Sequence, residues 1–102
     1  MELRHLKYFV VVAEDLNFSR AAVRLYISQP ALSRQIKNLE DELGVVLFLR
    51  QSDGLKLTEG GVFFLEQAKD ILHRSHATVQ TIQAHHTSTD KPLVIGYIPT
   101  IL

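Results

Sequence analysis

The sequence has 102 residues, of which 46% are hydrophobic, and its 11 basic residues balance its 11 acidic ones. A chain of this length can bury one modest core, so we expect one compact domain with an appendage and exclude two full domains. The sequence contains no cysteine, no secretory signal and no apolar run long enough to span a bilayer, which excludes disulfides and thiolate sites and predicts a cytoplasmic protein without membrane contact.

The charged residues are unevenly distributed along this neutral chain. Between Arg20 and Lys37 every charged residue is basic, and a compact acidic run follows at residues 40–42. A local basic face can bind phosphate even when the total charge is near zero.

Two helices are predicted at the start of the chain. Apolar residues recur at spacings of three and four over residues 3–16, which is typical of a helix with one buried face. Ser19 is placed to cap a second, short helix that ends near Leu25. Its small residues Ala21 and Ala22 allow the close helix crossing that a helix-turn-helix requires.

A third helix is predicted over residues 28–43, capped by Ser28 and ended by Gly44. Proline is tolerated in its first turn, because amides there have no intrahelical partner to lose. One face of the helix is apolar and is expected to be core. The other face is polar and basic, and it consists of Gln29, Pro30, Ser33, Arg34 and Lys37.

A two-stranded hairpin, or wing, is predicted over residues 46–57. Residues 45–50 are apolar and compatible with a β-strand, an Asp-Gly turn signal follows, and residues 55–57 alternate like a short return strand. Thr58 can cap the next helix. The order of these elements predicts a mainly α winged helix-turn-helix domain over residues 1–58, whose third helix is presented to the major groove of DNA.

A long helix is predicted over residues 59–86. At about 1.5 Å per residue it is too long to be covered by a domain of this size. Its apolar seam repeats at alternating three and four residues, which favours dimerisation, although packing on a further domain of the same protein would explain it as well. The seam consists of Leu65, Ala68, Leu72, Ser75, Val79 and Ile82.

After this helix the sequence predicts a hinge over residues 87–92 and a buried strand over residues 93–102. The strand has no partner strand within the sequence. We therefore expect the chain to break off where a second domain begins.

The polar face of the third helix carries groups that suit DNA. Arg34 can donate two hydrogen bonds to guanine or to a phosphate, Gln29 can pair with adenine, and Ser33 can bond to either base. Lys37 suits a phosphate, and Pro30 suits a thymine methyl group. Two alternatives remain open on residue types alone. The face could be ordinary solvated helix surface, or the protein could be a helical protein-interaction module whose basic face meets an acidic partner.

Residues 18–36, together with the motifs at 39–44, 47–50 and 57–61, closely resemble the LysR-type transcriptional regulators. The resemblance implies a homodimer, often assembled into a tetramer, that binds an interrupted inverted repeat in double-stranded DNA. It also implies antiparallel pairing of the linker helices and wings near the flanking minor groove. This fragment would hold no cofactor, whereas the full-length protein would bind a small-molecule inducer in its C-terminal domain and have RNA polymerase as a partner.

Carried over by position, the resemblance implies that Gln29, Pro30, Ser33 and Arg34 contact bases or adjacent phosphates. The full set of DNA-binding residues that we predict is Ser19, Arg20, Ser28, Gln29, Pro30, Ser33, Arg34, Lys37, Arg50 and Lys56. The sequence departs from the family at the wing tip, residues 52–54, where many members are basic. The minor-groove contact would then fall to Arg50 or Lys56. Arg50 has an equal alternative, an ion pair with the acidic run at 40–42. Tyr26 stands where such turns often use glycine, and we expect it to pack beside the turn.

An enzyme is not indicated. The sequence lacks a glycine-rich phosphate loop and a nucleophile-elbow motif. His73 and His76 have a spacing that could hold a metal, but no carboxylate or thiol stands at a matching position to complete the site. We therefore predict no metal site and interpret these histidines as solvated side chains.

Overall fold

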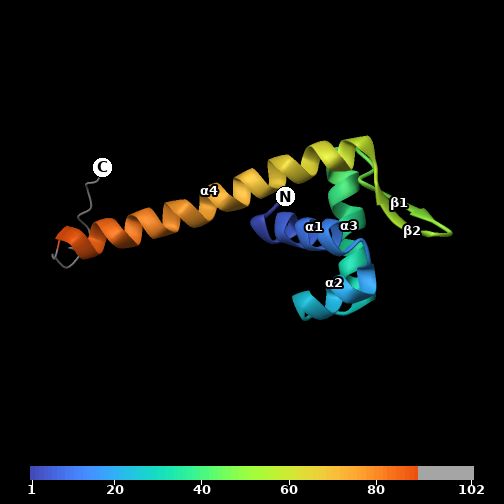
Figure 1. Cartoon of the computed structure of the whole chain (residues 1–102), viewed down its shortest axis with the longest axis horizontal. Coiled ribbons are helices and arrows are strands. Elements are labelled where there is room, and N and C mark those ends of the chain that lie inside the picture. Colours follow the sequence, from blue (N-terminus) through green and yellow to red (C-terminus); the bar gives the residue numbers. More distant parts are fainter. Residues whose placement is uncertain (90–102) are drawn as a thin grey trace. The chain divides into compact units, whose positions relative to one another are not determined.

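The computed structural model of the chain describes residues 1–89, and Figure 1 labels its helices and strands. In chain order these are α1 (Leu3–Asp15), α2 (Phe18–Leu25), α3 (Gln29–Leu43), β1 (Phe48–Gln51), β2 (Gly54–Leu57) and α4 (Glu59–Thr89). The three helices, the wing and the long final helix confirm the predicted mainly α architecture. A first compact unit, Met1–Leu72, holds everything up to the early turns of α4.

The end of α4 differs from the prediction. The helix expected over residues 59–86 continues to Thr89, so the first residues of the predicted hinge are helical. Serine and threonine lower helix propensity by only a few tenths of a kcal/mol, and the first strong helix breaker in this stretch is Pro92. The remainder of the predicted hinge and the predicted strand at 93–102 lie outside the described residues.

The start of α2 also differs from the prediction. Asn17 is the residue in extended conformation before the helix, and its side chain accepts a hydrogen bond from the backbone amide of Arg20 at 2.9 Å. Ser19 therefore does not cap α2, as the sequence suggested, but lies exposed within its first turn. Asparagine is as good a cap as serine, and here it stands where the backbone turns.

The predicted limits of α3 are confirmed. Ser28 Oγ accepts a hydrogen bond from the amide of Ala31 at 3.2 Å, and Pro30 occupies the first turn. The helix ends at Gly44, which adopts the left-handed conformation at a φ of 70°. The polar face of α3 therefore begins at the capped end of the helix.

Tyr26 does not pack beside the turn between α2 and α3, so this prediction was wrong. This residue ends α2 in the left-handed conformation, at a φ of 60°, and its side chain is 94% exposed. Its amide donates to the carbonyl oxygens of Ala22 and Val23, and the amide of Ile27 also donates to Ala22. The turn is thus held by backbone hydrogen bonds, and the Tyr26 side chain takes no part in setting its angle.

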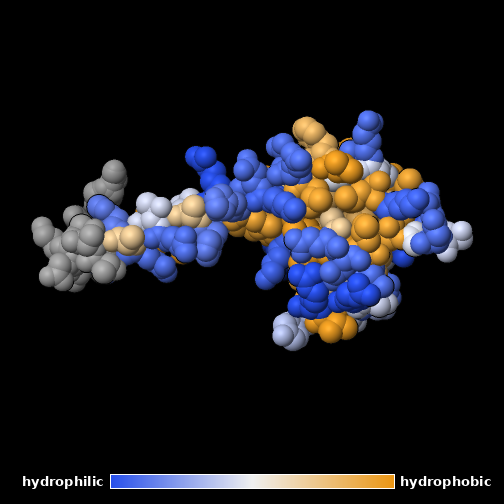
Figure 2. Space-filling view, in the orientation of Figure 1, coloured by the Kyte–Doolittle hydropathy of each residue, from blue (hydrophilic) through white to orange (hydrophobic). Residues whose placement is uncertain are grey.

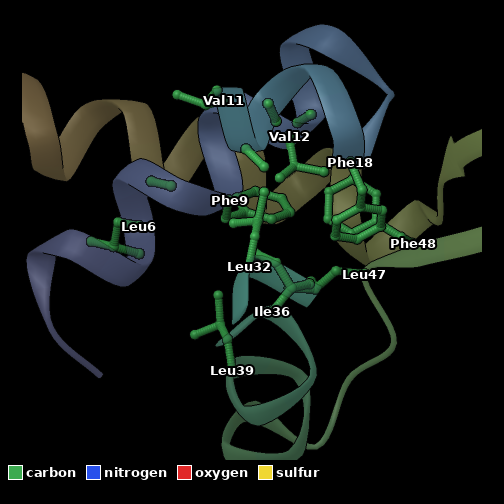
Figure 3. Close-up of a cluster of buried hydrophobic side chains, with 14 residues drawn as sticks. Leu6, Phe9, Val11, Val12, Phe18, Leu32, Ile36, Leu39, Leu47 and Phe48 are labelled. Carbon is green, nitrogen blue, oxygen red and sulfur yellow. The ribbon is translucent and has the colours of Figure 1, made fainter. Parts of the chain in front are cut away.

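The core joins all four helices of the first unit to the base of the wing (Figure 3). Phe9 of α1 is fully buried, and its ring centroid lies 5.4 Å from that of Phe48 and 5.0 Å from that of Phe64. Leu32 of α3 and Leu47 are likewise fully buried. Each such side chain contributes roughly 1.5–3 kcal/mol on burial. The core therefore fixes the orientation of α3 relative to α1, α2 and the wing.

The wing is an antiparallel pair in which Phe48 lies opposite Leu57 and Gln51 opposite Gly54. Its first strand begins at Phe48, later than the sequence suggested. The reason is Glu40, whose Oε2 accepts hydrogen bonds from the amides of Leu47 at 2.7 Å and of Phe48 at 3.2 Å. This carboxylate ties the base of the wing to α3.

The start of α4 is held against the same segment. Thr58 Oγ1 accepts from the amide of Gly61 at 2.9 Å, which confirms the predicted cap, and donates to the carbonyl oxygen of Val46 at 2.6 Å. A Cβ atom at Gly61 would collide with the carbonyl oxygen of Leu47. Only glycine allows this approach of α4 to the base of the wing.

Candidate nucleic-acid interface

The polar face of α3 lies opposite its buried face. Leu32, Ile36 and Leu39 are buried in the core, so the residues between them are turned outward. Pro30, Arg34 and Lys37 are exposed, whereas Gln29 and Ser33 are half-buried. The structure therefore brings the predicted recognition residues of α3 onto one accessible face.

The basic residues on this side of the unit differ in how they are engaged. Arg34 has no hydrogen bond or ion pair within residues 1–89, and neither does the side chain of Arg20 in α2. Lys37 lies 3.2 Å from Asp41, but both side chains are more than 60% exposed, at 69% and 63%, so solvent screens the pair. These three cations are available to an anion.

Arg24 is the exception among the basic residues of the helix-turn-helix. Its guanidinium lies 2.7 Å from Asp15 and 3.5 Å from Glu14, at the end of α1. The Asp15 side chain is only 12% exposed. Arg24 therefore holds α2 against α1.

Arg50 of β1 lies against α3, because its Nη2 donates a hydrogen bond to Oγ of Ser33 at 2.8 Å. Its Cζ also lies 4.4 Å from the ring centroid of Phe18. A cation over an aromatic face at this distance is attracted by the ring quadrupole. The contact joins two of the predicted site residues, Ser33 and Arg50, and adds Phe18, which was not among the predicted site residues.

The alternative of an ion pair between Arg50 and the acidic run is wrong. Within the described chain each acid of the run has another partner: Glu40 takes the wing amides, Asp41 lies near Lys37, and Glu42 lies 2.7 Å from the amino group of Met1. The sequence could not show this, because the pairing depends on where the wing leaves α3.

A pocket of about 200 Å³ lies between α3 and β1 beside this contact. Its volume is below the range of roughly 300–1,000 Å³ that is typical of small-molecule sites. It is a crevice in the recognition face, lined by Phe18, Ser33, Ile36, Lys37, Glu40, Phe48 and Arg50.

The tip of the wing carries little positive charge. Lys56 Nζ lies 3.9 Å from a carboxylate oxygen of Asp53, and both side chains are exposed. Ser52 and Asp53 form the exposed turn between the strands. The nearby carboxylate offsets the charge that Lys56 would present to a phosphate.

The predicted apolar seam of α4 divides into two parts. Ala68 is fully buried in the core of the first unit, and Leu65 and Leu72 pack against that core. Ala68 therefore cannot contact a second chain, which corrects the prediction. Val79 and Ile82, by contrast, are 51% and 61% exposed. In the face shown in Figure 2, hydrophobic residues gather over the first unit, while the later part of α4 is mainly hydrophilic.

Among residues 1–89 no three histidine, aspartate or glutamate side chains lie where they could hold a metal ion together. No helix in the same range combines the length and the apolar character needed to cross a membrane.

Comparison with known proteins shows extensive similarity. The family described as bacterial regulatory helix-turn-helix protein, lysR family, matches residues 3–62. The transcriptional regulator CatR of Pseudomonas putida is 48% identical over 102 residues, which is 100% of this chain and 35% of CatR. BenM of Acinetobacter baylyi is 44% identical over 102 residues, 100% of this chain and 33% of BenM. The chain thus spans about a third of the length of the curated relatives that it matches.

Two solved structures are similar over most of the chain. The crystal structure of the BenM_DBD/catB site 1 DNA complex has a TM-score of 0.79 and 48% identity, and covers 82% of this chain and 94% of that one. The CbnR_DBD-DNA complex has a TM-score of 0.79 and 46% identity, covering 83% of this chain and 98% of that one. Both are complexes with DNA.

Proposed function

The chain belongs to the lysR family of bacterial regulatory helix-turn-helix proteins, and on that premise we propose that it is the DNA-binding part of a sequence-specific transcription regulator. The names of CatR and BenM describe regulators, and the BenM_DBD and CbnR_DBD structures contain DNA. The chain is a binding module, not an enzyme, and residues 1–58 form the DNA-binding domain.

The observation that carries this proposal is that Arg34 is exposed and has no partner in the described chain. It is exposed on the outer face of α3, and no group within residues 1–89 neutralises its guanidinium. A guanidinium has five donors in a planar fork that matches guanine O6 and N7, or a phosphate. Arg34 therefore reads the major groove, with Pro30 one turn before it and Gln29 one turn before Ser33.

Residues around α3 position the duplex through its phosphates. Lys37 lies about one turn beyond Arg34, and Arg20 extends from α2 without a partner in the described chain. Ser19 and Ser28 lie near the N-terminal ends of α2 and α3, where the helix dipole favours phosphate. Contacts of this kind fix the register on DNA and carry no sequence information.

The wing contributes less than it does in a protein with a basic tip. Lys56 reaches the flanking minor groove, where its charge is offset by Asp53. Arg50 is held by Ser33 of α3 and Phe18 of α2 and does not extend toward the tip.

Self-association follows from the exposed part of the α4 seam. Val79 and Ile82 expose apolar surface at helical spacing, and Ser75 precedes them on the same face. A homodimer that pairs these residues places two α3 helices on one duplex, and a pair of dimers gives a tetramer. The target is then an interrupted inverted repeat whose half-sites are separated by about 10 base pairs or a multiple.

The full-length protein has further properties that follow from the family. We infer a cytoplasmic regulator in which residues 59–86 link the DNA-binding domain to an inducer-binding domain. The inducer is a small molecule, and RNA polymerase is the partner through which transcription changes. The fragment itself binds DNA without a cofactor.

Fluorescence anisotropy tests the proposal on three proteins: the wild type, Arg34→Ala and the control Lys7→Ala. The ligands are a duplex selected from a genomic pool and a scrambled duplex, at about 150 mM salt, where nonspecific binding is weak. We expect the wild type and the control to prefer the selected duplex by about a thousandfold and Arg34→Ala to lose roughly 1–3 kcal/mol of that preference. Equal, weak binding of both duplexes by the wild type would instead favour a protein partner for the basic face.

A further inference from the structure

The contact between Arg50 and Ser33 links the wing to the recognition helix at the level of the DNA-reading face. The guanidinium of Arg50 lies 2.8 Å from Ser33 Oγ and 4.4 Å from the centre of the Phe18 ring. Phe18 is itself fixed, because it is only 8% exposed and its ring lies 5.9 Å from that of Phe48. Arg50 is thus held from two sides.

This contact determines the direction of the hydrogen bond at Ser33. A guanidinium has N–H donors and no acceptor, so the Ser33 hydroxyl must be the acceptor. The hydroxyl has one proton of its own, and no group within residues 1–89 receives it. Since one of the two lone pairs faces Arg50, the proton is turned away from the wing.

We propose that Arg50 is a positioning residue that makes Ser33 a hydrogen-bond donor toward an acceptor atom of duplex DNA. The inference rests on the proposed function and makes it more specific, because a free serine hydroxyl serves donors and acceptors equally. The acceptors that fit are a phosphate oxygen, N7 or O6 of guanine, N7 of adenine and O4 of thymine. The exocyclic amines of adenine and cytosine, which only donate, would use the second lone pair and leave the hydroxyl proton without an acceptor, so they fit less well.

A double-mutant cycle tests this role. Arg50→Met removes the donors but retains an apolar stem over Phe18, and Ser33→Ala removes the hydroxyl. Any direct attraction between the Arg50 charge and DNA enters both legs of the cycle and cancels, so the coupling reports on the pair alone. We expect Ser33→Ala to weaken binding of the selected duplex about tenfold. Arg50→Met should then reduce the affinity for the selected duplex by a several-fold smaller factor in the Ser33→Ala background than in the wild type.

A second cycle with Arg4→Met in place of Arg50→Met is the control, since Arg4 is exposed and lies near Glu2, remote in sequence from both elements. Its coupling to Ser33→Ala should be absent. Circular dichroism on heating checks that each variant folds, and Arg50→Leu, which also lacks donors, replaces Arg50→Met in a further cycle if that variant unfolds. Additive losses for Arg50 and Ser33 would overturn the proposal.

Two comparisons separate the sources of the acceptor. If Ser33 donates to a phosphate, Ser33→Ala weakens the selected and the scrambled duplex by the same factor. If it donates to a base edge, only the selected duplex is affected, and a 7-deazapurine at the contacted position reproduces the loss when N7 is the acceptor. A wild type without preference for the selected duplex contradicts the proposed function itself, whereas a clear preference with no coupling removes only the role of Arg50.

Discussion

Glu40 near the C-terminal end of α3 accepts a 2.7 Å hydrogen bond from the backbone amide of Leu47, the residue that precedes the wing. The same oxygen accepts from the amide of Phe48 at 3.2 Å. One half-buried carboxylate therefore satisfies two amides that the β-ladder leaves unpaired, and it sets the point at which the wing leaves the recognition helix.

The first prediction concerns this carboxylate. Glu40→Ala should lower the free energy of unfolding by about 2 kcal/mol, because hydrogen bonds to charged groups are worth roughly 1.5–3 kcal/mol and two buried amides lose their acceptor. Urea unfolding followed by circular dichroism measures the change. Asp41→Ala is the control, since its exposed pair with Lys37 should contribute less than about 1 kcal/mol. Equal losses for the two variants would contradict the anchoring role.

The second prediction compares two adjacent glycines in α4. At Gly61 a Cβ meets the backbone of Leu47, which cannot move without shifting the core, so Gly61→Ala should destabilise the protein by roughly 1–3 kcal/mol. At Gly60 the nearest atom is Cγ1 of Val45, at 2.8 Å, and that side chain is exposed and can turn away. Gly60→Ala should therefore be tolerated. Thermal unfolding measures the stability of the two variants. If Gly60→Ala were the less stable one, α4 would not be in close contact with Leu47.

The third prediction concerns Tyr26. A non-glycine residue in the left-handed conformation is strained by roughly 1 kcal/mol, and the exposed side chain of Tyr26 gains little from packing in return. Tyr26→Gly should stabilise the domain by up to about 1 kcal/mol, or leave it unchanged where the added chain entropy offsets the relief. Val23→Gly, in the regular part of α2, is the control and should destabilise it. A marked loss of stability in Tyr26→Gly would show that the ring supports the turn after all.

The fourth prediction tests self-association through α4. Ile82→Asp should convert dimers to monomers in light scattering, because the charge would be buried in the proposed seam. Gln80→Asp, on another side of the helix, is the control and should remain dimeric. Leu72→Asp is unsuitable for this test, since Leu72 packs on the core of its own chain. A dimeric Ile82→Asp would place the interface elsewhere.

The fifth prediction concerns the target. Inserting about five base pairs between the half-sites rotates one of them by half a helical turn, so two α3 helices can no longer reach both from one side. Tight binding should be lost in an anisotropy titration, and inserting about ten base pairs should restore part of it. Binding that ignores both insertions would contradict a twofold dimer on DNA.

The helices, the wing and the polar face of α3 were predictable because each depends on neighbours in the sequence. Ser28 and Gly44 act within one turn of their own positions, and the spacing of buried residues assigns Ser33 and Arg34 to the outer face. The wrong predictions concern the choice of a cap between two nearby residues, or contacts between segments that are distant in the sequence. Both Asn17 and Ser19 have side chains that suit a cap, and only the backbone angles at Asn17 decide between them.

The contacts of Arg50 and Ala68 could not be predicted in the same way. An arginine at the end of a strand can meet acids, aromatics or DNA, and its pairing with Ser33 and Phe18 depends on how the wing is placed against α2 and α3. Ala68 fits a dimer seam and a domain core equally well by periodicity. Its burial depends on how α4 packs against the core of the first unit, which no local pattern reveals.

In the wing, the residues that pack on the core lie at the base, and the residues exposed to solvent or a partner lie at the turn. Phe48 at its base is buried and Leu57 opposite is half-buried, whereas Ser52 and Asp53 at the turn are exposed, and Asp53 lies near Lys56. Substitutions at the turn consequently leave the core untouched. The residues of the turn can therefore change in evolution, or be replaced by design, without loss of the packing that stabilises the fold.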